Sequence, residues 1–110
     1  MKKAEYYINV IQGKYPKVSG YVETVTDSKG NTLTIGYDKR YEGGWKATEL
    51  NTGFCVSIGE IATKKKCVEF VHNHIDIIVD IYNRRMTDEN YYNNWIKPFE
   101  DFVNANGAYK

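Results

Sequence analysis

The segment from Thr63 to Arg85 constrains the fold of this 110-residue chain more than any other part of its sequence. Its apolar residues recur with a helical period, and its polar residues share one stripe: Glu69, Asn73, Asp76, Asp80 and Asn83. At roughly 100° per residue that stripe spans about 80°, and an arc of roughly 200° on the rest of the helix is mostly apolar. A surface helix needs an apolar stripe of only about 100°. We therefore expect one long helix that is covered on two sides.

The apolar arc of this helix predicts which of its residues are buried. His74, Ile78 and Ile81 lie well inside the arc, so we expect them in the core, with His74 neutral and hydrogen-bonded. Ile77 and Val79 lie on its edges. If one side of the helix is a homodimer interface instead of core, these edge residues would belong to that interface.

Helix-end signals place two helices in the second half of the chain. Thr63 is a suitable N-cap, and Arg84 and Arg85 suit the negative end of the helix dipole. Thr87 is the expected cap of a last helix, whose apolar face contains Tyr92, Trp95, Ile96, Phe99, Phe102 and Val103. Because the helical period runs through Pro98, we expect one kinked helix there.

The middle of the chain has the alternation of an antiparallel β-meander. The predicted strands are Tyr21 to Asp27, Thr32 to Tyr37, Trp45 to Leu50 and Phe54 to Ile58. The three-residue loop that ends in Gly53 is typical of a type I turn closed by a left-handed glycine. One apolar face of four such strands needs a cover. The sequence therefore predicts an α+β fold, with a four-stranded antiparallel β-meander packed against the long helix and the kinked helix.

The first residues fit two patterns. Ala4, Tyr7, Ile8 and Ile11 have the spacing of a short helix, whereas Tyr6, Ile8 and Val10 also alternate as in a strand. We favour a short N-terminal helix over residues 3–12. Gly13 and Pro16 then end this element.

Composition narrows the class of protein. The chain is 42% hydrophobic and 26% charged with a net charge of +1, which argues for one ordered domain over residues 1–110 and against a polybasic nucleic-acid binder. It has no apolar run that could span a bilayer and no secretory signal pattern. We therefore expect a cytoplasmic protein without membrane contact, in which Cys55 and Cys67 are free thiols.

No sequence motif carries recognisable catalytic chemistry. His72 and His74 would point about 200° apart on a helix, so they cannot share a metal ion. Cys67 and His74 would lie roughly 10 Å apart, beyond the reach of a general base, and nothing in the sequence supports a pair of Cys55 with His74. We therefore expect no enzyme, no metal and no cofactor.

Two segments have the composition of contact surfaces. The segment 38–44 is longer than a hairpin needs, and its cations and aromatics suit an interface: Tyr37, Lys39, Arg40, Tyr41 and Trp45. Lys64, Lys65 and Lys66 occupy a helix start, where positive charge is unfavourable and phosphates often bind. These eight residues are the candidate binding site.

In composition, size and strand–helix organisation the chain resembles small accessory proteins of phages and mobile elements, including anti-CRISPR inhibitors. Ten Tyr against two Leu, and twelve Lys against three Arg, match the AT-rich coding of such proteins. The resemblance contains no diagnostic motif and assigns no functional residue. It implies a non-catalytic module that binds a host protein, such as a CRISPR nuclease, in the host cytoplasm.

Three alternatives stay open beside that hypothesis. A β-meander with exposed aromatics and nearby Lys and Arg could bind nucleic acid by stacking bases. A small enzyme could hold a phosphorylated or nucleotide-like ligand on Lys64 to Lys66. Each of these forms could also be a homodimer.

Overall fold

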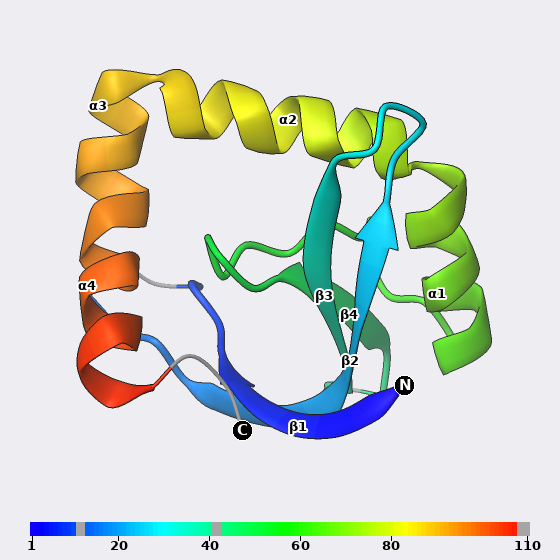
Figure 1. Cartoon of the computed structure of the whole chain (residues 1–110). Coiled ribbons are helices and arrows are strands. Elements are labelled where there is room, and N and C mark those ends of the chain that lie inside the picture. The colour runs from blue at the N-terminus through cyan, green and yellow to red at the C-terminus, as the bar shows by residue number, and fades with distance from the viewer. Residues whose placement is uncertain (11–12, 41–42, 108–110) are drawn as a thin grey trace.

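A four-stranded antiparallel sheet and a series of helices make up the molecule (Figure 1). The computed structural model describes residues 1–10, 13–40 and 43–107. The strands follow the order of the chain: β1 (Lys2–Tyr7), β2 (Lys17–Thr26), β3 (Thr32–Lys39) and β4 (Trp45–Glu49). This arrangement confirms the predicted α+β fold with an antiparallel meander.

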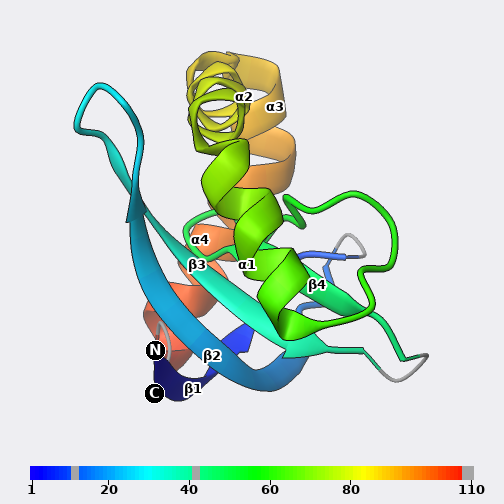
Figure 2. The same cartoon turned by 90° about the vertical axis from the view of Figure 1, so that its right-hand side faces the viewer.

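The helices run around three sides of the sheet in Figure 1. They are α1 (Lys64–Asn73), α2 (Ile75–Thr87), α3 (Glu89–Tyr91), the π-helix η1 (Tyr92–Ile96) and α4 (Lys97–Asn106). In Figure 2 α2 is seen nearly end-on while α1 descends across the sheet, so the two helices run in different directions. In the described part of the chain, no helix is both long and apolar enough to cross a bilayer.

The predicted single long helix is wrong, because the chain bends at His74. This residue has φ −118° and ψ 15°, outside the helical region. Its backbone N–H donates to the carbonyls of Phe70 and Val71, and its Nδ1 hydrogen-bonds the Phe70 carbonyl at 2.8 Å. Its ring also stacks on the Phe70 ring at 4.3 Å. These contacts end α1 and let α2 start in a new direction.

The bend accounts for the wide apolar arc. Helix α1 buries Cys67 and Val71, whereas α2 buries Ile75, Ile78 and Val79. The prediction for Ile78 is confirmed, but the predicted burial of His74 and Ile81 is wrong. His74 is exposed, and the exposed fractions of Ile77 and Ile81 are 59% and 40%. Each of the two shorter helices therefore needs only one covered face.

The two faces of the sheet have separate apolar clusters. Toward α1 and α2 the sheet presents five buried side chains: Val25, Leu33, Ile35, Tyr37 and Ala47. On the other face, Ala4, Tyr6, Ile8 and Val22 form a second cluster. The Tyr6 ring lies against Gly36 of β3, and its hydroxyl donates to Asp38 Oδ1 at 3.0 Å.

The predicted N-terminal helix is also wrong, because residues 2–7 form strand β1. Ala4 pairs with Gly20 and Tyr6 pairs with Val18 of β2. Ala4 and Tyr6 are buried while Glu5 between them is exposed, which is the period of a strand. Pairing with β2 thus decides between the two patterns. Residues 11 and 12 lie outside the described residues.

The expected strand from Phe54 to Ile58 is replaced by an irregular segment. It retains one bridge, between Cys55 and Thr48 of β4. The Ala47 N–H donates to Ser57 Oγ at 3.0 Å, where a regular ladder would use a backbone carbonyl. The turn before this segment is as predicted, since Gly53 has φ 72°. The fourth strand of the sheet is therefore β1.

The C-terminal helix is kinked, as predicted, through a π-helical turn before Pro98. The Lys97 N–H donates to the carbonyl of Tyr92, five residues back. Ile96 and Phe99 are buried, so the kinked helix keeps its apolar face on the rest of the molecule. Thr87 is not its cap. Asp88 Oδ1 accepts from the Tyr91 N–H at 3.0 Å, and Thr87 is the last residue of α2.

Candidate functional site

The structure places the predicted contact residue Tyr37 in the core. Its exposed fraction is 0%, and its hydroxyl donates to Glu23 Oε2 at 2.7 Å. Burial, followed by the hydrogen bond to Glu23, raises the pKa of Tyr37 above its ordinary value. His72 Nε2 lies 3.0 Å from the same Glu23 oxygen. Tyr37 therefore anchors a polar chain that links the core to α1 and does not form part of the surface.

The rest of the predicted loop site is partly engaged in local contacts. Arg40 Nε lies 2.5 Å from Asp38 Oδ2, and Trp45 is half-buried against the core. Lys39 is exposed. Tyr41 lies outside the described residues.

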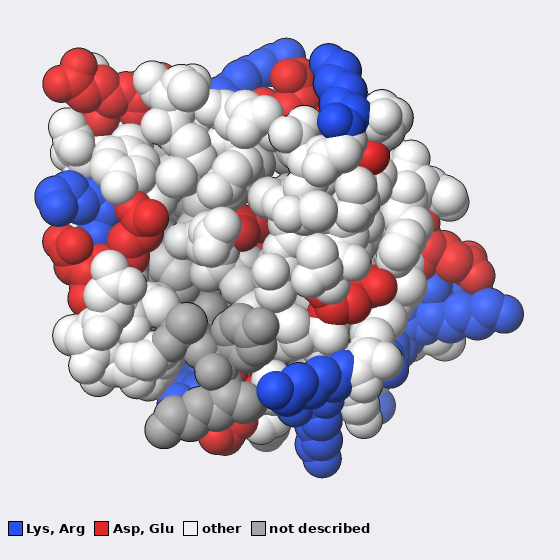
Figure 3. Space-filling model, viewed as in Figure 1, with Lys and Arg blue, Asp and Glu red and all other residues white. Residues whose placement is uncertain are grey.

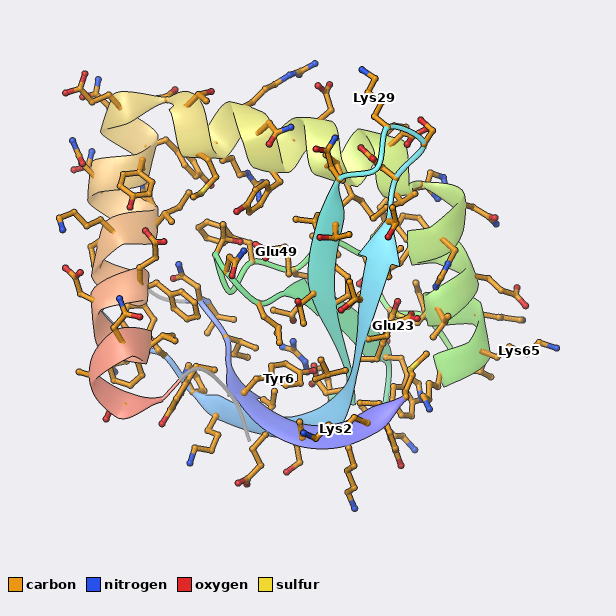
Figure 4. The ribbon with its side chains drawn as sticks, in the orientation of Figure 1. Lys2, Tyr6, Glu23, Lys29, Glu49 and Lys65 are labelled. Carbon is orange, nitrogen blue, oxygen red and sulfur yellow. The ribbon has the colours of Figure 1, made fainter. Side chains whose placement is uncertain are left out.

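The three lysines at the start of α1 differ in their surroundings. The Thr63 hydroxyl accepts from the Lys66 N–H at 3.2 Å, which confirms the predicted N-cap. Lys64 Nζ lies 3.8 Å from the centre of the Tyr21 ring, so this cation packs on an aromatic of β2. Lys65 and Lys66 are exposed, and Figure 4 shows Lys65 projecting away from the helix.

The structure brings these two predicted segments to the same end of the molecule. The Trp45 N–H donates to the Ile61 carbonyl at 2.8 Å, which holds the end of the loop beside the residues that lead into α1. In Figure 3 the Lys and Arg side chains lie mainly around the periphery of a largely uncharged face. The sheet aromatics are covered, because Tyr6 and Tyr37 are buried and Lys64 packs on Tyr21.

Sequence reasoning missed a cavity between α2 and the irregular segment after β4, which we name the α2 cavity. Its volume is about 120 Å³. The lining residues are Glu49, Thr52, Cys55, Val56, Ser57, Ile78, Ile81, Tyr82 and Arg85. They come from two parts of the chain: the end of β4 with the residues that follow it, and α2. These two parts are about 30 residues apart in the sequence. No local sequence pattern joins these elements.

Glu49 forms a buried polar part of the α2 cavity. Its exposed fraction is 1%, and Figure 4 shows its side chain in the interior below α2. Its carboxylate accepts from the Asn51 N–H at 2.6 Å, the Thr52 N–H at 2.8 Å and the Thr52 hydroxyl at 2.7 Å. Burial raises the pKa of Glu49 above its ordinary value, against the effect of these three hydrogen bonds.

Arg85 lies beside two neighbouring aromatic rings at the same cavity. Its guanidinium carbon lies 5.1 Å from the centre of the Phe54 ring and 5.7 Å from that of Tyr91. Among residues 1–10, 13–40 and 43–107, no carboxylate lies within ion-pairing distance of Arg85. The neighbouring Arg84, in contrast, pairs with Asp80 at 2.8 Å. Ile81 and Arg85 are four residues apart, so the sequence alone could have placed them on the same face of a helix.

The two thiols and His74 have separate local surroundings in the structure. Cys55 is an exposed thiol whose Sγ lies 3.4 Å from Ser57 Oγ, and Cys67 is buried. Burial is the main cause that raises the pKa of Cys67, to about 11. His74 hydrogen-bonds the Phe70 carbonyl, not a thiol. In the described ranges no set of three or more His, Cys, Asp or Glu side chains could hold a metal ion.

No protein-family model, curated protein or solved structure matches this chain. Its functional interpretation therefore comes from the geometry of its own surface.

Proposed function

We propose that this protein is a non-catalytic protein-binding module and that the α2 cavity is the centre of its contact surface. The observation that carries the proposal is Arg85, which is held by two aromatic rings beside an apolar cavity and has no carboxylate partner in the described part of the chain. Arg and aromatic side chains around a small pocket are typical of the residues that dominate binding energy at protein interfaces.

The neighbouring surface supports the same proposal. Ile81 lines the cavity and has an exposed fraction of 40%, so a partner would remove apolar surface from water there. The aromatic rings of Phe54 and Tyr91 contact the guanidinium of Arg85 and restrict it before a partner arrives. A pre-ordered side chain loses less conformational entropy on binding than a mobile one.

We further propose a host defence effector as the partner, which the module would block by occupying its surface. The support for this finer statement is the compositional resemblance to phage accessory proteins, together with a small fold that presents a defined contact site. Lys39, Lys65 and Lys66 are exposed near the start of α1 and would form a second contact region.

A comparison of matched variants tests the protein-binding function. Ile81→Asp and Arg85→Glu alter the α2 cavity, whereas Ile77→Asp and Arg84→Glu make the same changes at exposed positions of α2 outside it. Each immobilised protein is incubated with a lysate of a bacterium that has an AT-rich genome, and the recovered proteins are quantified by mass spectrometry.

We expect one or more stoichiometric partners to be retained by the wild type and by both control variants, and lost with both cavity variants. Circular dichroism spectra confirm that all five proteins are folded. Equal recovery by all five proteins, or no stoichiometric partner on the wild type, would contradict the proposal.

A further inference from the structure

The size of the α2 cavity limits what it can hold. Its volume of about 120 Å³ is slightly smaller than an apolar cavity of roughly 150 Å³ that binds benzene. Val56, Ile78 and Ile81 supply apolar walls, and the ring of Tyr82 adds a further surface. One branched aliphatic side chain is of a size that fits this space.

Of the two charged groups that line the cavity, Arg85 has the greater unused hydrogen-bonding capacity in the described part of the chain. Arg85 keeps its guanidinium donors available, because its contacts in the described residues are with aromatic faces. Glu49 already accepts three hydrogen bonds, and a carboxylate has about four acceptor sites. A ligand carboxylate can therefore accept from the free donors of Arg85, whereas a cationic donor would be repelled by Arg85 and would find few free acceptor sites on Glu49.

We infer that the α2 cavity binds an aliphatic side chain that is followed closely by a carboxylate, as in an acidic segment of a partner protein that contains leucine. The aliphatic group fills the space between Val56, Ile78 and Ile81, and the carboxylate accepts hydrogen bonds from the guanidinium of Arg85. This inference rests on the proposed protein-binding function and names the chemistry of the segment that the partner contributes.

Arg85 is well placed for this role because its fork geometry suits a carboxylate. A guanidinium can donate two parallel hydrogen bonds to a carboxylate, which an ammonium group cannot do. The contacts of Arg85 with Phe54 and Tyr91 are cation–π contacts, which occupy none of its N–H donors. The aliphatic part supplies the apolar contact and the carboxylate supplies the orientation.

Three small probes of the same shape test the inference. They are 4-methylpentanoate, 4-methylpentan-1-ol and 4-methylpentan-1-amine, which share a leucine-like branched end and carry a negative, a neutral and a positive head group. Each is titrated into the ¹⁵N- and methyl-labelled protein at pH 7, and chemical-shift changes report the site and the affinity.

We expect the carboxylate to shift the methyl signals of Val56, Ile78 and Ile81, to bind more tightly than the alcohol, and to leave the amine as the weakest ligand. Arg85→Ala should weaken carboxylate binding by about tenfold and leave the alcohol unchanged. Arg84→Ala removes the same charge from the adjacent position and should have no effect.

Amine binding at least as tight as that of the carboxylate, or shifts that map outside the cavity, would overturn the inference. The comparison of the three probes uses the wild-type protein, so it does not depend on the folding of any variant. If the protein prefers the carboxylate probe but retains no partner from the lysate, the protein-binding function alone is refuted. If the wild type retains a partner that both cavity variants lose, but the protein does not prefer the carboxylate probe, the inference alone is refuted.

Discussion

Replacing Gly36 by alanine tests the packing of β1 across the sheet. A Cβ at this position would lie 2.6 Å from Tyr6 Cε1 and 2.8 Å from the Tyr6 hydroxyl oxygen, closer than real Cβ contacts. The Tyr6 ring cannot withdraw easily, because its exposed fraction is 1% and its hydroxyl is bonded to Asp38. Burial, followed by the charge of Asp38, raises the pKa of Tyr6, so the hydroxyl keeps its proton and donates.

The expected cost follows from two opposing effects. Alanine in a strand is favoured over glycine by roughly 0.5–1 kcal/mol, whereas overpacking a core costs roughly 1–3 kcal/mol. Gly36→Ala should therefore destabilise the wild type by about 1–2 kcal/mol. In a Tyr6→Leu background the ring atoms that clash are absent, and the same substitution should be neutral or stabilising. The coupling energy between the two positions should be about 1–3 kcal/mol.

Urea unfolding measures this coupling, with the fluorescence of Trp45 and Trp95 as the signal. A Tyr7→Leu background is the control, because Tyr7 packs on Phe102 of α4 with a ring distance of 4.9 Å. Its side chain belongs to the opposite face of β1, so we expect no coupling with Gly36. An equal cost of Gly36→Ala in the wild type and in Tyr6→Leu would refute the reasoning.

Three further predictions concern a buried acid, a helix cap and the lysines. Burial raises the pKa of Glu49 in the folded protein above the value of 4.5 that an exposed glutamate has. The folded state therefore holds this proton more tightly than the unfolded state, and the free energy of unfolding falls as the pH rises above 4.5. Urea unfolding should therefore show that the stability of the wild type relative to Glu49→Gln falls between pH 4.5 and pH 7.5; a constant difference would contradict this. Because Asp88 caps the helix, Asp88→Ala should lower the free energy of unfolding by about 1 kcal/mol, and Thr87→Ala by less than about 0.5 kcal/mol. Thermal unfolding measures both costs, and equal costs would contradict the assignment of Asp88 as the cap. We expect oligonucleotide binding, measured by fluorescence anisotropy at low salt, to be absent or unchanged by Lys65→Glu, because the sheet aromatics that would stack bases are covered.

Local signals in the sequence predict the parts of the fold that depend on neighbouring residues. The hairpin of β2 and β3, the cap at Thr63, the turn at Gly53 and the kink at Pro98 follow from such signals. Residues 3–12 fit both a helix and a strand, and only their pairing with β2, some 15 residues away, decides between them.

No glycine or proline near His74 indicates the bend in the sequence. The bend depends on a side-chain bond to the Phe70 carbonyl and on two helices that pack in different directions. The candidate site shows the same limit. The loop and the lysines near α1 could be identified by composition, although Tyr37 is in the core. The α2 cavity could not, since its walls meet only in the folded chain.

The contact between β1 and the last helical segment has a consequence for synthesis on the ribosome. The Asn9 side-chain amide donates to the Trp95 carbonyl across 86 residues, and Tyr7 packs on Phe102. At roughly 5–20 residues per second, the ribosome needs about 5–20 s to make the helical residues that Asn9 and Tyr7 contact. The strands β1, β2 and β3 can pair early, but the Tyr7 side of β1 stays uncovered until Phe102 is made. Translation speed thus sets how long the Tyr7 side of this strand stays open to other proteins.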